Sequence, residues 1–433
     1  MSDASPKSAS ESSAHNRTRM IHGSSRSTHW EYSHHVVPPI SSSATFRLDS
    51  VERGAQGFID FAEGTAEQHD PIYIYDRLSE PTRDMLEDNL AVAEGGDSAL
   101  CFASGMAAIS GVINCLLRSE EHVVTHHVLY GCTYSLLTNW LPRHRIGVAF
   151  EDLTDVNNLR RAIKPETRIV YFESPVNPDM TLIDIGAIRS VVDEANRNRP
   201  DDKRLWIIVD NTFATPHCQR PIELGADIVC QSLTKGIGGF GTDVGGAVIF
   251  PKKLRRELQL YRKDFGGILS PKAAWATLVY GLPSLATRMV NYQKTAHHVA
   301  RFLEAHDKVE RVLYPGLESF PQFALAKKQM RDSKGHFAPG SLLYFILKDA
   351  DPAGHRGTAF VNYVAKNAYS ISLAVSLGQI KTLIECPFSM THSSLPQVEM
   401  ARHGVLPGGI RLSCGLEDWE DIVQDLDAAL RAI

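Results

Sequence analysis

The sequence has no long apolar run and no excess of basic residues. Its apolar segments are of strand length, and none approaches the roughly 18 residues that a membrane helix needs. The N-terminus lacks the apolar core of a secretory signal. Aspartate and glutamate (50) outnumber lysine and arginine (45), which gives a net charge of −5. We therefore expect a cytoplasmic protein that binds neither membranes nor nucleic acid.

Cysteine is also sparse, and the seven cysteines contain no Cys-x-x-Cys pair. This odd number fits free thiols in a reducing compartment better than a disulfide or zinc framework. Histidine is more common, with 18 residues, but adjacent pairs such as His126 and His127 are expected to point in different directions. The sequence therefore predicts no metal site.

The 433 residues, of which 43% are hydrophobic, are enough for two or three structural units. Residues 1–79 are predicted to form an N-terminal arm. Most of its first 33 residues, rich in Ser, Arg and His, are expected to be disordered or to lie on another subunit. A large domain is predicted for residues 80–286 and a smaller C-terminal α/β domain for residues 287–433. The polar run 327–336 is predicted to be a loop or an insertion.

Strand-like and helix-like segments alternate through the large domain, after a first helix that ends at Gly95. Strands are expected at 100–102, 122–125, 146–150, 169–172 and 205–209, with helices between them at 104–117, 130–140, 155–162 and 185–195. In the smaller domain, helices are expected at 285–306 and 419–433, and a strand at 340–347. Such alternation predicts a mostly parallel sheet with helices on both faces.

A lysine and an aspartate each follow a strand-like segment. Lys235 ends the motif Ser-Leu-Thr-Lys before a glycine-rich run, and Asp210 follows the apolar segment 205–209. Because open α/β sheets bind ligands at the carboxyl ends of their strands, the two side chains should meet in one crevice. Alone, each would more often be a surface lysine or a turn aspartate. Together, an amine, a carboxylate and flanking hydroxyls suit pyridoxal phosphate.

Three motifs occur in the order and spacing of one family. They are residues 210–216 (Asp-Asn-Thr-Phe-Ala-Thr-Pro), 219–229 and 232–235. From about Val37 to its C-terminus the chain resembles the Cys/Met-metabolism (trans-sulfuration) family of pyridoxal-phosphate enzymes. The resemblance implies the fold-type-I PLP-dependent transferase fold, with a mostly parallel seven-stranded sheet in the large domain. The chain departs from the family pattern at Leu233, Gly236, Phe240 and Asp243.

The resemblance assigns the cofactor ring to four residues. Lys235 would bind the cofactor covalently, and Asp210 would face the pyridine nitrogen. Tyr130 would stack on the ring and give a proton to the departing group, while Asn177 would lie near the ring hydroxyl. Each role is what the resemblance implies for the matching position.

The cofactor phosphate is assigned in the same way. A helix predicted to start after Ser104 offers main-chain amides, and Gly105 allows a close approach. The phosphate ligands implied by the resemblance are Gly105, Met106, Ser232, Thr234 and, from a neighbouring subunit, Tyr75 and Arg77. We accordingly expect a homotetramer built from dimers with shared active sites.

Substrate recognition is expected near the C-terminus. Arg411, in an apolar strand-like run, matches the arginine that grips the substrate carboxylate, and Ser376 matches a residue that helps to hold it. Cys132 and the run 390–394 (Met-Thr-His-Ser-Ser) are shared with methionine γ-lyases. Lys235, once displaced by substrate, can carry protons between Cα and Cβ.

The distal pocket distinguishes members of the family. Enzymes that handle cystathionine resemble one another in polar or charged residues there, but this chain has Ile74, Ser135 and Val375 at three such positions. The expected function is therefore a methionine γ-lyase-like α,γ-elimination that gives 2-oxobutyrate, ammonia and a thiol from a small sulfur amino acid. O-acylhomoserine sulfhydrylase, cystathionine γ-synthase and cystathionine lyase activities remain alternatives. A catalytically silent assembly subunit is a further alternative, suggested only by Gly236 and Phe240.

Overall fold

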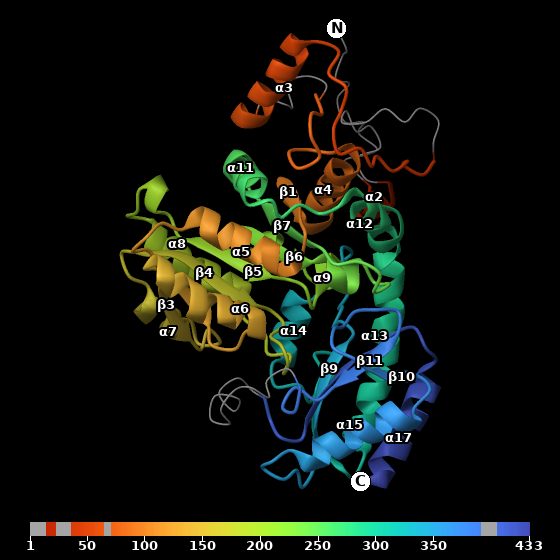
Figure 1. Ribbon diagram of the computed structural model, residues 1–433. Coiled ribbons are helices and arrows are strands. Elements are labelled where there is room, and N and C mark those ends of the chain that lie inside the picture. Colours follow the sequence, from red (N-terminus) through yellow and green to blue (C-terminus); the bar gives the residue numbers. More distant parts are fainter. Residues whose placement is uncertain (1–13, 23–35, 65–70, 391–404) are drawn as a thin grey trace.

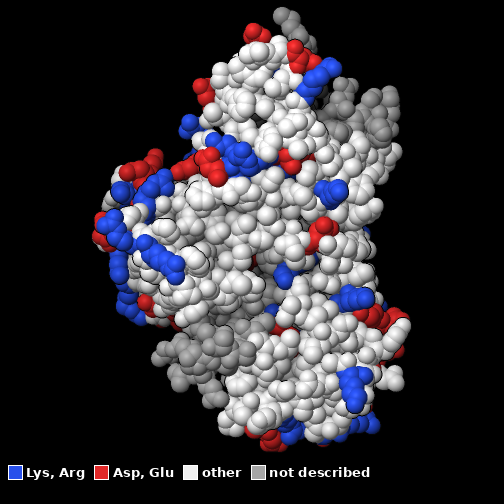
Figure 2. Space-filling view, viewed as in Figure 1, with Lys and Arg blue, Asp and Glu red and all other residues white. Residues whose placement is uncertain are grey.

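The computed structural model describes residues 14–22, 36–64, 71–390 and 405–433. Figure 1 shows a large sheet flanked by helices and, toward the C-terminal end, a second sheet with its own helices. No helix among the described residues is long and apolar enough to cross a membrane. On the face shown in Figure 2, acidic and basic side chains are interspersed along the rim of the molecule.

The large sheet has seven strands in the order β1-β7-β6-β5-β4-β2-β3. The strands are β1 (Ser98–Phe102), β2 (His122–His126), β3 (Gly147–Glu151), β4 (Thr167–Glu173), β5 (Trp206–Asp210), β6 (Ile228–Ser232) and β7 (Gly246–Phe250). Strand β7 is antiparallel to both β1 and β6, while the pairs among β2 to β6 are parallel. The prediction of a mostly parallel seven-stranded sheet is therefore confirmed.

Helices cover both faces of this sheet because successive strand residues point to opposite sides. Tyr171 and Ile208 pack in one apolar cluster with α5 (Gly105–Leu116), and their neighbours Val170 and Ile207 pack in another with α7 (Val156–Ala162) and α8 (Ile185–Asn196). The helical segments of this part are α4 (Pro81–Glu94), α5 (Gly105–Leu116), α6 (Gly131–Ser135), η2 (Leu136–Trp140), η3 (Leu141–His144), α7 (Val156–Ala162), α8 (Ile185–Asn196), η4 (Asp201–Lys203), α9 (Thr215–Cys218), α10 (Pro221–Leu224), η5 (Leu233–Ile237), η6 (Lys252–Leu254), α11 (Arg255–Phe265), α12 (Pro271–Ala276) and η7 (Thr277–Gly281).

The end of α4 agrees with the prediction, whereas the helix predicted at 130–140 differs from it. Helix α4 ends as expected, because Gly95 adopts a left-handed conformation with φ 75° and its N–H bonds back to the last turn. The single helix predicted at 130–140 is instead α6 followed by η2, a π-helical turn. Such turns insert one extra residue into a helix and are frequent at functional sites.

The second sheet has five strands in the order β10-β11-β12-β9-β8. They are β8 (Val309–Leu313), β9 (Leu342–Leu347), β10 (Ile371–Leu373), β11 (Thr382–Glu385) and β12 (Gly409–Ser413), and the helices are α13 (Leu282–Ala305), α14 (Phe323–Gln329), α15 (His355–Asn367) and α17 (Trp419–Ala432). Tyr344 of β9 packs with Met180 and Leu182 of the large-sheet part. The predicted boundary near residue 286 falls inside α13 and stays a prediction.

Two segments expected to be irregular are partly ordered. Within the first 33 residues, of which 1–13 and 23–33 lie outside the described part, α2 (Asn16–His22) packs on the same chain: Met20 is buried, and Asn16 Nδ2 donates to Ala93 O at 3.2 Å. A further helix of the arm, α3, spans Val51–Glu63. In the run 327–336, the first three residues complete α14, and Gln329 is buried. The loop prediction is therefore wrong for that part, because Gln329 bonds to the core of the large-sheet part.

Candidate active site

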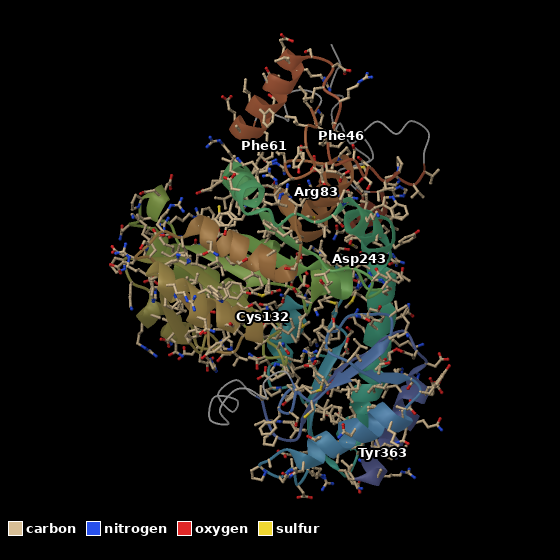
Figure 3. All side chains as sticks on the ribbon, in the orientation of Figure 1. Phe46, Phe61, Arg83, Cys132, Asp243 and Tyr363 are labelled. Carbon is tan, nitrogen blue, oxygen red and sulfur yellow. The ribbon has the colours of Figure 1, made fainter. Side chains whose placement is uncertain are left out.

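A cavity of about 920 Å³ lies between the part built on the large sheet and the part built on the second sheet, and residues of both line it. The sequence-predicted residues in its wall are Gly105, Met106, Tyr130, Cys132, Asn177, Asp210, Ser232, Thr234, Lys235, Val375, Ser376 and Arg411. Tyr75 and Arg77 are not among its lining residues. In Figure 3, Cys132 lies at the edge of the large-sheet part that faces the second sheet. The structure thus brings together the predicted site residues within its described part, except Tyr75 and Arg77, which are assigned to a neighbouring subunit, and Ile74, which is buried and does not line the cavity.

Lys235 follows β6 and lies in the π-helical turn η5, where its own backbone is non-helical. Its amine Nζ donates to Ser376 Oγ at 2.7 Å. Burial lowers the pKa of Lys235 to about 8, with a further lowering from the Arg411 cation that the Glu385 carboxylate opposes. About one tenth of this amine is therefore neutral, and nucleophilic, at pH 7, which is far more than for an ordinary lysine.

The loop after Lys235 is held by a buried arginine. The Arg288 guanidinium donates to the carbonyl oxygens of Gly236 at 2.7 Å and of Ile237 at 3.0 Å. A Cβ at Gly236 would lie 2.7 Å from Thr215 Cγ2, so a side chain there would require a shift. The departure from the family pattern at Gly236 thus has a local packing reason and leaves the lysine in place.

Two carboxylates stand at neighbouring strand ends. Asp210 ends β5 and pairs in register with Glu173 at the end of β4. The main-chain N–H of Thr212 donates to Asp210 Oδ1 at 3.0 Å, and that of Tyr130 donates to Glu173 Oε1 at 2.6 Å. Burial raises the pKa of both carboxyl groups. Glu173 is not among the residues that the sequence motifs single out. The available signal was its position directly after the apolar segment 169–172, just as Asp210 follows the apolar segment 205–209.

An anion site lies at the start of α5. Ser104 caps the helix, and a Cβ at Gly105 would lie 2.9 Å from Ser232 Cβ, so only glycine permits this approach. The first amides of α5 and the hydroxyl of Ser232 therefore converge, as a phosphate requires. The Thr234 hydroxyl already exchanges hydrogen bonds with Gly245, at 3.0 and 3.3 Å. With an amine, a carboxylate and an anion site in one cavity, the residues fit pyridoxal phosphate.

Arg411 is fixed in the cavity wall by three oxygen atoms. Its guanidinium lies 3.0 Å from Glu385 Oε2 and donates to Asn177 Oδ1 and Ser376 O, each at 3.0 Å. Glu385 and Arg411 are opposite each other on β11 and β12, and both are buried. We had not predicted Glu385. The signal available in the sequence was the cost of an unpaired arginine in an apolar strand, which calls for a buried partner.

Tyr130 and Cys132 form a pair on another side of the cavity. The Cys132 thiol donates to Tyr130 Oη at 3.4 Å. Burial raises the pKa of Tyr130 to about 12, and the hydrogen bond with Cys132 adds to the effect. The phenol therefore keeps its proton at neutral pH and is available as an acid. The run 390–394 shared with methionine γ-lyases lies outside the described residues beyond Met390.

His126 and His127 are closer to each other than expected. Together with Asp152 they place ligand atoms within 4.8 Å of one another. The N–H of Leu153 donates to His126 Nδ1 at 3.2 Å, and His127 Nδ1 lies 3.3 Å from Glu151 O. The main chain thus uses one ring nitrogen of each histidine, and the absence of a metal site stays a prediction.

Comparison with known proteins gives one consistent result. Residues 17–431 match the family model described as Cys/Met metabolism PLP-dependent enzyme. The chain is 40% identical over 400 residues to an L-methionine gamma-lyase of Fusobacterium nucleatum subsp. polymorphum, which covers 92% of this chain and 94% of that protein. It is 38% identical over 418 residues to an L-methionine gamma-lyase of Porphyromonas gingivalis (96% and 97% covered). It is also 38% identical over 362 residues to a cystathionine beta-lyase of Coxiella burnetii (83% and 87%).

The surroundings of Lys235 make a prediction about its titration. In the cofactor-free chain, labelling of Lys235 by an amine reagent should increase with pH through a midpoint at about 8. Glu385→Gln should move this midpoint down, because it removes an anion that favours the ammonium form. Arg411→Leu should move it up, because it removes a cation that disfavours that form. Mass-spectrometric labelling, with the exposed Lys334 as internal reference, measures both. Shifts of the same sign in the two variants would contradict this electrostatic description.

Proposed function

The chain belongs to the Cys/Met metabolism family of pyridoxal-phosphate-dependent enzymes, and on that premise we propose that it cleaves the Cγ–sulfur bond of methionine. Methionine and water would give 2-oxobutyrate, ammonia and methanethiol. The proposal is supported by relatives named L-methionine gamma-lyase at 38–40% identity over more than nine-tenths of the chain. Its structural support comes from the uncharged side chains around Val375.

The cofactor would be held by the residues already described. Lys235 would bind it covalently, Asp210 would accept a hydrogen bond from the ring nitrogen, and the amides at the start of α5 would bind the phosphate. When bound, the cofactor draws electrons away from the substrate Cα. Every later proton transfer falls to side chains of the chain itself.

Substrate would be oriented by Arg411, whose planar fork suits a carboxylate. Because Glu385, Asn177 and Ser376 hold the guanidinium at 3.0 Å each, the fork is in place before substrate arrives. Lys235 is well suited to remove the Cα proton and to act next at Cβ, since its pKa is lowered to about 8.

The departing sulfur would receive its proton from Tyr130. The phenol lines the cavity, is 44% exposed and has its pKa raised to about 12, so it holds the proton until sulfur departs. Cys132, which donates to Tyr130 Oη, would orient the phenol. We infer that this pair supplies the general acid of the elimination.

The observation that carries the choice of substrate is the uncharged wall at Val375 and Ser135. Val375 is 60% exposed in the cavity, and Ser135 lines it as well. The acids in the described wall are Glu173, Asp210 and Glu385, of which Glu385 already pairs with Arg411. The ammonium of cystathionine would therefore lack a free partner near Val375, whereas a methyl thioether needs none.

A second candidate, γ-replacement on an O-acylhomoserine, is favoured by one polar group. Asn139 lines the cavity from the π-helical turn η2, and its Nδ2 donates to Ser135 Oγ at 3.1 Å. The amide has a second N–H that can donate to an acyl carbonyl. Both candidate reactions share their first steps. They differ in whether the four-carbon unit is hydrolysed to 2-oxobutyrate or is captured by a thiol to give a new amino acid.

We also infer a homotetramer built from dimers with shared active sites. Arg77 donates to Lys263 O at 2.7 Å and lies 5.4 Å from the centre of the Tyr75 ring, and both side chains are exposed on their own chain. Exposed side chains of this kind are available to a second subunit. In the neighbouring subunit, Tyr75 and Arg77 would complete the phosphate site, which is the role that the family resemblance gives them.

The uncharged wall predicts substrate preference. The kcat/KM for methionine should exceed that for cystathionine, because a missing charge-assisted contact costs roughly 1.5–3 kcal/mol, or about 10- to 150-fold. Val375→Glu should shift the ratio toward cystathionine, and Val375→Gln, which adds similar bulk without charge, is the matched control. The ratio is read from 2-oxobutyrate release, with O-acetylhomoserine plus thiol tested in parallel. A wild-type ratio well below one would show that this wall has been misinterpreted.

The shared site predicts complementation between two inactive variants. Mixed Arg77→Ala and Lys235→Ala proteins should recover up to about a quarter of wild-type activity, because half of randomly formed dimers are mixed and each has one intact site. Recovery should follow subunit exchange, monitored by native mass spectrometry. Exchange without recovery would place Arg77 outside the partner's active site.

A further inference from the structure

Glu173 and Asp210 form an acidic pair that the mechanism above uses only in part. They stand in register at the ends of β4 and β5, and both line the cavity. Among the described residues, neither carboxylate forms an ion pair with a lysine, arginine or histidine. Arg411, the arginine in the cavity wall, pairs with Glu385 instead. Two adjacent anions without a cation are unfavourable in a buried site, so one of them is expected to hold a proton.

Burial and the neighbouring charge, weighed against the hydrogen bonds, indicate which carboxyl holds the proton. Asp210 has the Thr212 N–H at 3.0 Å, and the side chain of Thr212 also favours its anion. Burial, followed by the charge of Asp210, raises the pKa of Glu173 to about 8. Glu173 Oε1 accepts from the Tyr130 N–H at 2.6 Å and the main-chain N–H of Asn177 also favours its anion, but these contacts do not offset the burial. The other titratable groups facing the pair are Tyr130, Tyr171 and Cys230, whose pKa values burial raises.

We propose that Glu173 is the proton reservoir of the cofactor site: it is a neutral acid in the cofactor-free chain and releases its proton when the positively charged ring nitrogen docks at Asp210. Only the O–H bond of Glu173 breaks: its proton passes to solvent when the ring nitrogen arrives protonated, and to the ring nitrogen when that atom arrives neutral. The physical cause is the arriving cation, which stabilises both carboxylates as anions. Glu173 thus acts on the cofactor site only through its own charge, and we class it as a positioning residue and not as a catalytic one. The inference rests on the family's cofactor and not on which Cγ bond the enzyme breaks.

Proton uptake on cofactor binding tests the proposal. Pyridoxal phosphate is titrated calorimetrically into the full-length, cofactor-free chain in buffers of different ionisation enthalpy, for wild type and Glu173→Gln. At about pH 7.5, wild type should take up fewer protons per site than the variant, by up to about one, because Glu173 supplies part of the demand. At about pH 9.5 the two should converge, because Glu173 is already ionised in wild type. Equal uptake at both pH values would overturn the proposal.

Glu94→Gln is the matched control. Glu94 is likewise fully buried with its pKa raised, to about 7, but it binds Asn211 and Gln231 and does not line the cavity. This variant should therefore show the wild-type proton uptake. If Glu94→Gln increased the proton uptake above wild type by as much as Glu173→Gln does, the effect would belong to buried acids in general, and the role of Glu173 would be overturned.

A measurement on wild type alone covers the case in which Glu173→Gln does not fold. Infrared difference spectra at about pH 7.5 should show loss of a protonated-carboxyl band when the cofactor binds, and the carboxyl of Glu94 should cancel in the difference. If no such band is lost, Glu173 does not release a proton.

Thermal stability gives a second test. The folded-state pKa of Glu173 lies above its unfolded value, so the protonated carboxyl stabilises the fold fully at low pH, and this contribution is lost as the pH rises. Where Glu173→Gln does fold, cofactor-free wild type should thus lose thermal stability relative to the variant from about pH 4.5 to about pH 8, and parallel curves would contradict the proposal.

Discussion

The active site depends on the ion pair between Arg411 and Glu385. The two residues are opposite each other on β12 and β11, and their buried charges lie 3.0 Å apart at the wall that faces Lys235. Removing one partner would leave the other charge buried and unpaired, which typically costs about 3–5 kcal/mol. The pair also sets the electrostatics of the lysine, because Arg411 lowers the pKa of Lys235 and Glu385 opposes that shift. The position of the guanidinium and the reactivity of the amine are therefore coupled.

The main features of the fold and the cofactor site could be predicted because they rest on local sequence patterns. Apolar segments of strand length alternate with helical segments, and such an order permits few topologies other than a mostly parallel sheet. Lys235 and Asp210 each follow one of these strands, so the rule that ligands lie at the carboxyl ends of strands was enough to bring them together. The family implied by the same motifs agrees with the match over residues 17–431.

What the sequence did not predict depends on pairing between distant segments. Glu385 becomes a site residue only through the register of β11 with β12, and Glu173 only through that of β4 with β5. Helix α2 lacks a periodic apolar pattern and gains its order from contacts of Met20 with the rest of the chain. The role expected for Asn177 at the ring hydroxyl also stays a prediction, since in this structure its side chain accepts a hydrogen bond from Arg411.

Gly236 and Phe240 were the only hints of a catalytically silent protein, and neither displaces Lys235 from the cavity. Gly236 fits against Thr215, and Phe240 lies 5.6 Å from the Arg288 guanidinium that holds the same loop. We propose that Lys235 binds the cofactor covalently. Borohydride reduction of the purified holoenzyme, followed by peptide mapping, tests it directly. We expect the pyridoxyl group on Lys235, and its recovery on any other lysine would contradict the assignment of the whole site.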